Sequence, residues 1–109
     1  MDKETEEQIK ELQILEQNLQ AVLMQKQAFQ SEISEVENAI EQLADTKEEV
    51  YKIVGNIMIK SSKESLSKDL NSKKEIVALR LKSLDAQEKS LSEHTEELRK
   101  KVLSKIKRE

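Results

Sequence analysis

Apolar residues follow a strict alternating spacing of three and four along the first part of the chain. Nine of the ten positions in this series are apolar, and Lys26 is the exception. The series is Leu12, Leu15, Leu19, Val22, Lys26, Phe29, Ile33, Val36, Ile40 and Leu43. Such spacing keeps one stripe of side chains on one face of a helix, and that face needs a partner helix to cover it. It therefore predicts a long coiled-coil helix over residues 2–47.

A second series with the same spacing supplies the partner. Its ten positions are Leu70, Lys74, Val77, Leu81, Leu84, Glu88, Leu91, Thr95, Leu98 and Val102, of which seven are apolar. Polar residues in such a seam lower stability but restrict register and partner choice. The series predicts a second long helix over residues 62–107. Ser61 and Glu64 fit a capping box at its start, with Ser62 and Ser65 as rival N-caps.

The segment between the two series has a different character. Residues 50–60 are rich in β-branched and apolar side chains, and Gly55, the only glycine of the chain, is followed by Asn56. Gly and Asn tolerate the positive φ that a two-residue hairpin turn needs. The segment therefore predicts strands at Val50–Val54 and Ile57–Lys60. The alternative, one unbroken helix, is disfavoured by the central glycine and the β-branched run.

A hairpin at this point makes the two helices antiparallel. The charge distribution along the chain supports this side-by-side pairing of the helices. Residues 1–49 contain 13 acids and 4 bases, whereas residues 50–109 contain 9 acids and 15 bases. Segments of opposite net charge attract each other when they lie side by side, although each exposed pair contributes little. The expected fold is all-α dominated: a long antiparallel two-helix coiled coil with a central β-hairpin, forming a single domain over residues 1–109.

The hairpin carries more apolar surface than its own helices can cover. Side chains alternate between its two faces, and both faces are apolar. Hairpins from several chains could cover this apolar surface and pair their open edges by joining edge to edge into an intersubunit β-barrel, which is the expected arrangement. The alternative is a hairpin that acts as a local lid on its own coiled coil. The residues expected to mediate oligomerisation are Val50, Tyr51, Ile53, Val54, Gly55, Ile57, Met58 and Ile59.

The two chain ends hold a second excess of apolar residues. Several of them lie outside or beside the seam, which suggests a contact surface for something apolar. The alternative is a broader stripe that packs against a third helix or simply frays. The expected contact residues are Ile9, Leu12, Ile14, Leu15, Leu98, Val102, Leu103 and Ile106.

Composition argues against an enzyme. The chain has no Cys and no Trp, 36% of its residues are hydrophobic and 38% are charged. No phosphate loop, nucleophile elbow or metal-ligand cluster is present, and no cofactor is expected. His94 is the only histidine and is interpreted as a solvated helix residue. The basic run near the C-terminus lies opposite an acidic N-terminal segment, and no aromatic residues are available to stack on bases, so nucleic acid is not an expected partner. A membrane is not an expected partner either, because the partner helix already covers the apolar stripe.

The N-terminal segment MDKETEEQIK is acidic and lacks the apolar stretch of a signal peptide. The absence of Cys is compatible with a reducing compartment. A cytoplasmic location is therefore expected.

The order of helix, hairpin and helix resembles the β-class subunits of prefoldin, also called GimC, and the archaeal type in particular. The residues that carry the resemblance are Gln25–Gln27, Val50–Lys52, Val54–Gly55, Ile57–Lys60 and the stretch LRLKSLDAQEKSL over Leu79–Leu91. The resemblance implies a hexamer of two α and four β subunits, whose hairpins build a double β-barrel from which six coiled coils project. It also implies that the coiled-coil tips hold unfolded polypeptides and pass them to a group II chaperonin without consuming ATP.

Residues and resemblance together predict a holdase-type chaperone subunit. The barrel-forming residues coincide with the family's assembly hairpin, and the apolar excess at the chain ends coincides with its client-binding tips. The alternative function is a passive scaffold or spacer coiled coil that binds one defined folded partner.

Overall fold

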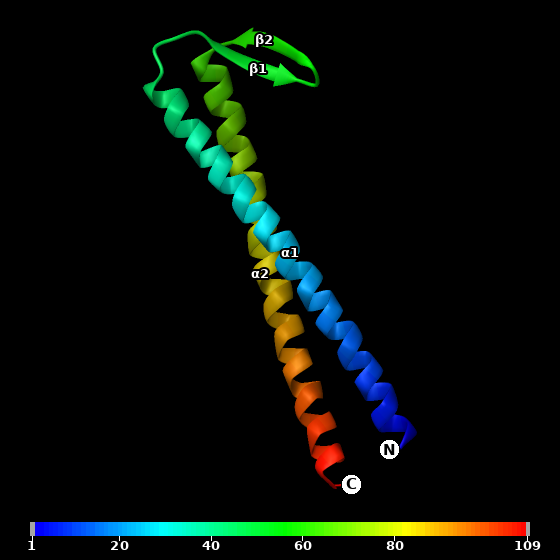
Figure 1. Ribbon diagram of the computed structural model, residues 1–109. Helices are drawn as coiled ribbons and strands as arrows, with labels where there is room; N and C mark the ends of the chain where they lie inside the picture. The colour runs from blue at the N-terminus through cyan, green and yellow to red at the C-terminus, as the bar shows by residue number, and fades with distance from the viewer. Residues whose placement is uncertain (1, 109) are drawn as a thin grey trace. The chain divides into compact units, whose positions relative to one another are not determined.

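The computed structural model describes residues 2–108, with side chains as far as Lys107. Along the chain, helix α1 (Lys3–Asp45) is followed by strands β1 (Val50–Val54) and β2 (Ile57–Ser61) and by helix α2 (Lys63–Arg108), as Figure 1 shows. The expected fold class, two long helices with a central antiparallel hairpin, is confirmed.

Helix α1 begins at a side-chain cap and ends just before a threonine. The Asp2 carboxylate accepts a hydrogen bond from the main-chain N–H of Thr5 at 2.7 Å. At the other end, the Thr46 N–H still donates to the Gln42 carbonyl, but the Thr46 hydroxyl accepts the N–H of Glu48 at 3.3 Å. A threonine side chain that binds the main chain two residues on favours a turn over a helix. The helix therefore stops two residues before the predicted residue 47.

Helix α2 is capped by Ser62. The Ser62 Oγ accepts a hydrogen bond from the Ser65 N–H at 3.1 Å, which satisfies a main-chain donor of the first turn. The capping box predicted for Ser61 and Glu64 is therefore wrong. Ser61 instead ends β2, where it pairs with Val50, and so its backbone is already committed to the sheet.

The folded chain divides into two compact units, and both helices contribute to each. The terminal unit consists of residues 1–27 and 82–109, of which the structure describes 2–27 and 82–108. The hairpin unit is Ala28–Leu81 and contains both strands.

In the terminal unit the helices are antiparallel. Early residues of α1 pair with late residues of α2: Lys105 Nζ lies 3.2 Å from Glu4, and Arg99 lies 2.9 Å from Glu16. The apolar core between the helices is formed by Leu15, Leu98 and Val102, with Ile9, Leu12 and Leu91 packed against it.

The hairpin unit repeats this antiparallel pairing. Lys73 and Lys74 of α2 lie 3.6 Å and 3.8 Å from Glu32 and Glu37 of α1, respectively. The Arg80 guanidinium lies over the Phe29 ring, 5.7 Å from its centroid, where a cation–π attraction applies. As predicted, most cross-helix pairs join an acid of the first segment to a base of the second.

Every one of the twenty seam positions is buried or half-buried. The polar exceptions have partners. Lys26 reaches Glu88 at 2.6 Å and Asp85 at 2.8 Å, and these contacts raise the Lys26 pKa, with Asp85 as the largest cause. The Thr95 hydroxyl donates to the Leu91 carbonyl at 2.6 Å. The two seams therefore include polar residues without leaving these side chains unpaired.

The hairpin has the predicted two-residue turn. Val54 pairs with Ile57, which leaves Gly55 and Asn56 as the turn residues. Gly55 has a φ of 62°, whereas no other described residue has a positive φ. Glycine at the first turn position with positive φ there alone is the pattern of a type II′ turn, whose twist suits the flanking strands. Strand β2 continues one residue beyond the predicted Lys60.

Candidate functional surfaces

The hairpin exposes apolar side chains on both faces. Cross-strand register places Val50, Lys52, Val54, Ile57 and Ile59 on one face and Tyr51, Ile53, Met58 and Lys60 on the other. The large apolar side chains from Tyr51 to Ile59 are between 48% and 70% exposed. In the part of the chain that the structure describes, the sheet has only these two strands, so both outer edges are unpaired.

An apolar hollow of about 480 Å³ lies beneath β1 in the hairpin unit. It is lined by the end of α1, by β1 and by the start of α2, including Leu43, Val50, Leu66 and Leu70. A hairpin that served as a lid would close over this space and bury one of its faces. The exposure of both faces contradicts the lid alternative.

Polar contacts hold the hairpin in place at its base. The Tyr51 hydroxyl donates to Glu49 at 2.8 Å, and the Lys60 ammonium donates to the same carboxylate at 3.2 Å. Hydrogen bonding by Tyr51, and then by Lys60, lowers the pKa of Glu49 below its ordinary value of 4.5. Lys52 reaches Asp69 of α2 at 3.2 Å. These contacts link the strands to each other and to α2 without covering their apolar faces.

The structure divides the eight apolar residues predicted near the chain ends into three groups. Ile14, Leu103 and Ile106 are 57%, 49% and 41% exposed, respectively. Ile9 and Leu12 are half-buried. Leu15, Leu98 and Val102 are at most 9% exposed because they form the core of the terminal unit. Only the first group is freely accessible in the closed helix pair.

The seam of the terminal unit becomes polar beyond this core. Thr5 is completely buried and Gln8 is half-buried. Thr5 Oγ1 and Gln8 Oε1 are both buried without a hydrogen-bond partner among the described residues. A buried polar atom without a partner costs about 1–3 kcal/mol. The first turns of α1 are therefore held to α2 less firmly than the leucine-lined core.

The sequence did not lead to a prediction for two further exposed apolar residues. Ile76 and Leu79 of α2 are 52% and 67% exposed, and both lie in the hairpin unit. They fall between seam positions, so the heptad spacing marks them as outward-facing. Their outward-facing positions could have identified them from the sequence, because large apolar residues on the outer face of a helix are uncommon in a chain this polar.

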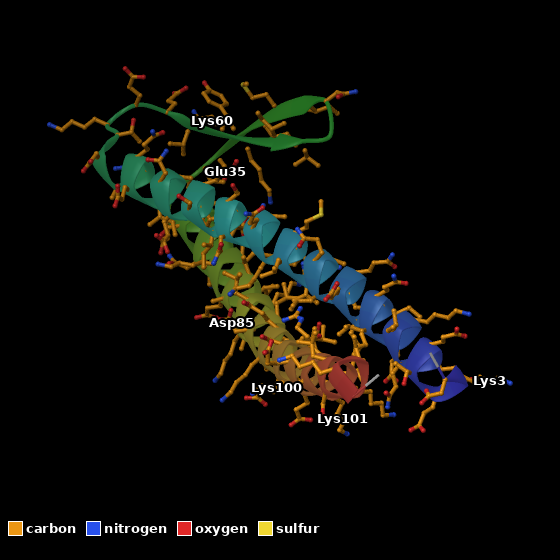
Figure 2. The ribbon with its side chains drawn as sticks, turned by 60° about the horizontal axis from the view of Figure 1, so that its bottom comes forward. Lys3, Glu35, Lys60, Asp85, Lys100 and Lys101 are labelled. Carbon is orange, nitrogen blue, oxygen red and sulfur yellow. The ribbon has the colours of Figure 1, made fainter. Side chains whose placement is uncertain are left out.

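Among the residues that the structure describes, the charged side chains near the chain ends form no recognisable catalytic or metal site. Lys100 and Lys101 are exposed on the last part of α2, and Lys3 is exposed at the start of α1 (Figure 2). His94 is exposed and lies 3.9 Å from Glu11. Within residues 2–108, no group of three potential ligands is arranged to hold a metal ion. No described helix contains an apolar stretch long enough to cross a membrane.

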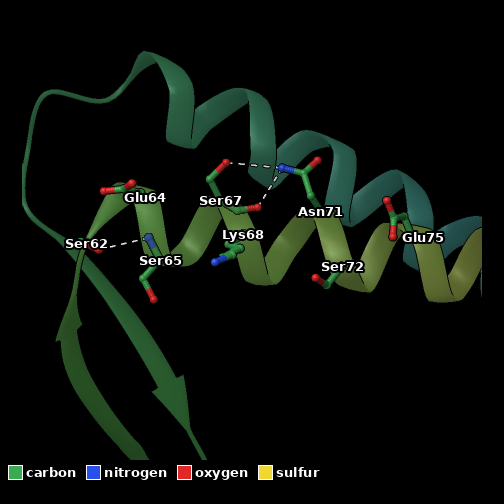
Figure 3. A pocket seen from close by; sticks show the side chains of 8 residues that line it. All are labelled: Ser62, Glu64, Ser65, Ser67, Lys68, Asn71, Ser72 and Glu75. Atoms are coloured by element: carbon green, nitrogen blue, oxygen red, sulfur yellow. Dashed lines mark hydrogen bonds between the residues drawn. The ribbon is translucent and has the colours of Figure 1, made fainter.

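A polar hollow follows the first turns of α2 and offers no reactive arrangement. It is lined by Ser62, Glu64, Ser65, Ser67, Lys68, Asn71, Ser72 and Glu75 (Figure 3). The Asn71 amide donates to the carbonyl and the hydroxyl of Ser67 at 2.8 Å and 3.4 Å, respectively. No histidine or cysteine lines the hollow, and the hydrogen bonds drawn in Figure 3 stabilise the helix itself.

Comparison with known proteins shows which family has this architecture. The family model described as prefoldin subunit matches residues 6–109. The chain belongs to the prefoldin subunit family. The prefoldin subunit beta of Archaeoglobus fulgidus is 40% identical over 96 residues, which cover 86% of this chain and 83% of that protein. The prefoldin subunit beta of Sulfurisphaera tokodaii is 38% identical over 101 residues, which cover 91% of this chain and 81% of that protein.

A solved prefoldin structure has the same fold. The crystal structure of the prefoldin beta subunit from Thermococcus strain KS-1 matches with a TM-score of 0.88 and 31% identity, covering 94% of this chain and 92% of that one. The resemblance seen in the sequence is thus confirmed, and the chain is a prefoldin-family chaperone subunit.

Proposed function

We propose that this prefoldin-family chain is an ATP-independent holdase subunit, not an enzyme, that captures unfolded polypeptides and delivers them to a group II chaperonin in the cytoplasm. The observation that carries the proposal is the presence of exposed apolar side chains in two separate places, the hairpin and the terminal unit. The first set serves assembly and the second serves client binding. Residues 1–109 act as one domain in this role.

Assembly follows from the hairpin. An isolated two-stranded hairpin is marginally stable in water, and this one leaves apolar groups on both faces. Pairing its open edges with hairpins of other subunits closes the sheet into a barrel and buries one face inside it. The partners are further copies of this chain and an α-type prefoldin subunit, in a complex of two α and four β subunits.

Client binding follows from the terminal unit. Ile14, Leu103 and Ile106 offer a small apolar surface, and burying apolar area contributes about 25 cal/mol per Å². One such patch binds weakly, but several patches held in one assembly bind the same unfolded chain with much higher avidity. Leu15, Leu98 and Val102 join the surface only when the helix ends separate. The polar layer at Thr5 and Gln8 makes that separation less costly.

The proposal is tested with the complex assembled from this chain and an α-type subunit. The measurement is light scattering from a chemically denatured protein diluted into buffer with and without the complex. Replacing Ile14, Leu103 and Ile106 with Ser should abolish most of the suppression of aggregation while sedimentation of the complex stays unchanged.

The matched control replaces Ile76 and Leu79 with Ser. These side chains are as exposed as those of the tested set but lie in the hairpin unit, so suppression should stay at the wild-type level. A triple variant that assembles and still suppresses aggregation fully would show that these residues are not the client surface. A complex that holds one folded protein but no denatured ones would instead indicate a scaffold.

A further inference from the structure

One stretch of α1 is nearly free of charge. In a chain with 38% charged residues, only Glu16 and Lys26 are charged between Gln13 and Gln27. Both are paired within the terminal unit: Glu16 with Arg99 at 2.9 Å, and Lys26 with Asp85 at 2.8 Å. The remaining outward-facing positions of this stretch carry amide or apolar side chains.

Seven of these outward-facing positions share one face of the helix, and the exposed Asn18 and Gln25 lie beside it. At 100° per residue the seven positions fall within an arc of about 140°, away from the seam. We call this the amide face, and all of its residues are exposed. It consists of Gln13, Ile14, Gln17, Gln20, Ala21, Met24 and Gln27.

The glutamines of the amide face are available to bind something else. None of their side-chain amides has a hydrogen-bond partner within 3.5 Å of good geometry among the described residues, and Gln13, Gln17 and Gln20 border a surface hollow together with Glu16. Each side-chain amide offers two donors and an acceptor without net charge. A peptide backbone presents the same uncharged groups in return.

We propose that the amide face binds the main chain of an extended, unfolded polypeptide. Glutamine amides exchange hydrogen bonds with its exposed N–H and C=O groups, while Ile14 and Met24 contact its apolar side chains. Because every polypeptide has the same main chain, this mode tolerates any client sequence and is indifferent to client charge. The inference rests on the proposed holdase function and extends the client surface from Ile14 along α1.

The composition of the face disfavours other occupants. A second copy docking helix to helix would need about two large apolar residues per heptad, but Ile14 and Met24 are ten positions apart. Nucleic acid would need cations, and the face has none. Ile14 belongs both to this face and to the proposed client surface.

The test measures binding of two fluorescent peptides to the assembled complex by anisotropy. One is an uncharged, unfolded peptide containing leucines, and the other has the same side chains but N-methylated amides at alternate positions. Methylation removes donors without removing apolar contacts. The wild-type complex should bind the unmethylated peptide about five- to tenfold more tightly than the methylated one. This difference in affinity corresponds to roughly one net hydrogen bond.

The matched variant replaces Gln13, Gln17 and Gln20 with Glu, which preserves size and helix propensity but removes NH₂ donors and adds charge. It should lose several-fold in affinity for the unmethylated peptide and bind both peptides alike. The control replaces Ser83, Ser90 and Ser92 of α2 with Glu and should bind as the wild type does.

The outcomes separate the two proposals. If the wild-type complex suppresses aggregation but binds both peptides equally, or if the glutamine variant binds like the control, the amide face is not a client site. If the wild-type complex neither suppresses aggregation nor binds either peptide, the holdase function itself is wrong.

Discussion

At the scale of single residues, the hairpin depends on Gly55. Its φ of 62° is a left-handed conformation that costs other L-residues about 1–2 kcal/mol. A Cβ added there would meet no atom within 4 Å, so the requirement is conformational and not steric. Asn56, with no positive φ, carries no such requirement.

Replacing Gly55 with Ala should therefore destabilise the hairpin by about 1–2 kcal/mol. Amide hydrogen exchange of β1 and β2 should accelerate, while the helical circular dichroism signal stays unchanged. Asn56→Ala is the matched control and should leave strand exchange near the wild-type rate. Equal exchange in the two variants would refute the role given to Gly55.

Glu49 gives the hairpin a dependence on pH. Its carboxylate accepts hydrogen bonds from Tyr51 and Lys60, which lower its pKa below 4.5. A lowered pKa in the folded state means that the stabilisation is present above the unfolded value and is lost as pH falls through the folded value.

We expect acidification below about pH 4.5 to weaken the contacts of Tyr51 and Lys60 with Glu49. Carbon-13 NMR of the Glu49 carboxyl should give the folded pKa directly. Tyr51→Phe removes the larger cause and should move that pKa back toward 4.5. A Glu49 titration unaffected by Tyr51→Phe would mean that the hydroxyl does not bind the carboxylate in solution.

At the scale of the elements, the sequence was sufficient to predict both helices, the hairpin and all twenty seam positions. Heptad spacing decides which face is buried, and a lone glycine in a β-branched run decides where the chain turns. The helix ends were less predictable, because Ser61 and Ser62 have the same side chain and either could cap the helix. Ser61 pairs with Val50 in the sheet, and Ser62 is therefore the residue that caps α2.

The terminal residues show why the exposed apolar surface near the chain ends was only partly predictable. Spacing places Leu15 in the seam and Ile14 beside it, yet both were expected to be contact residues, because spacing does not show how tightly a seam position is covered. The structure shows that Leu15 packs against Leu98 and Val102 while Ile14 stays exposed. The partner of Lys26 likewise depends on the register between the helices, which the seam pattern alone leaves open.

The polar layer of the terminal unit should make the first turns of α1 open easily. The double variant Thr5→Val with Gln8→Leu removes both buried oxygen atoms that lack partners and should stabilise this end by about 1–2 kcal/mol. Hydrogen exchange of amides in residues 5–15 should slow accordingly. Unchanged exchange would show that solvent already satisfies these groups.

At the scale of the whole molecule, charged side chains and exposed apolar side chains contribute in different ways. The first 49 residues carry a net charge of −9 and the remaining 60 carry +6, and cross-helix ion pairs match this division. Exposed ion pairs contribute little stability but penalise wrong registers. We expect the apolar surface of the hairpin instead to bind other subunits.

The purified chain alone should therefore sediment as a species larger than its monomer mass of 12.6 kDa. Changing Ile53, Ile57, Met58 and Ile59 to Ser should yield monomers that keep their helical circular dichroism, because these side chains are exposed in the single chain. A wild-type chain that sediments as a monomer, both alone and with an α-type subunit, would exclude assembly through the hairpin.

The position of Tyr51 has a practical consequence for all such measurements. It is the only tyrosine, the chain has no tryptophan, and it lies on β1 beside Glu49. Intrinsic ultraviolet emission therefore originates almost entirely from the strands, whereas far-ultraviolet ellipticity originates mainly from the helices. One unlabelled sample therefore reports separately on the hairpin and on the two helices.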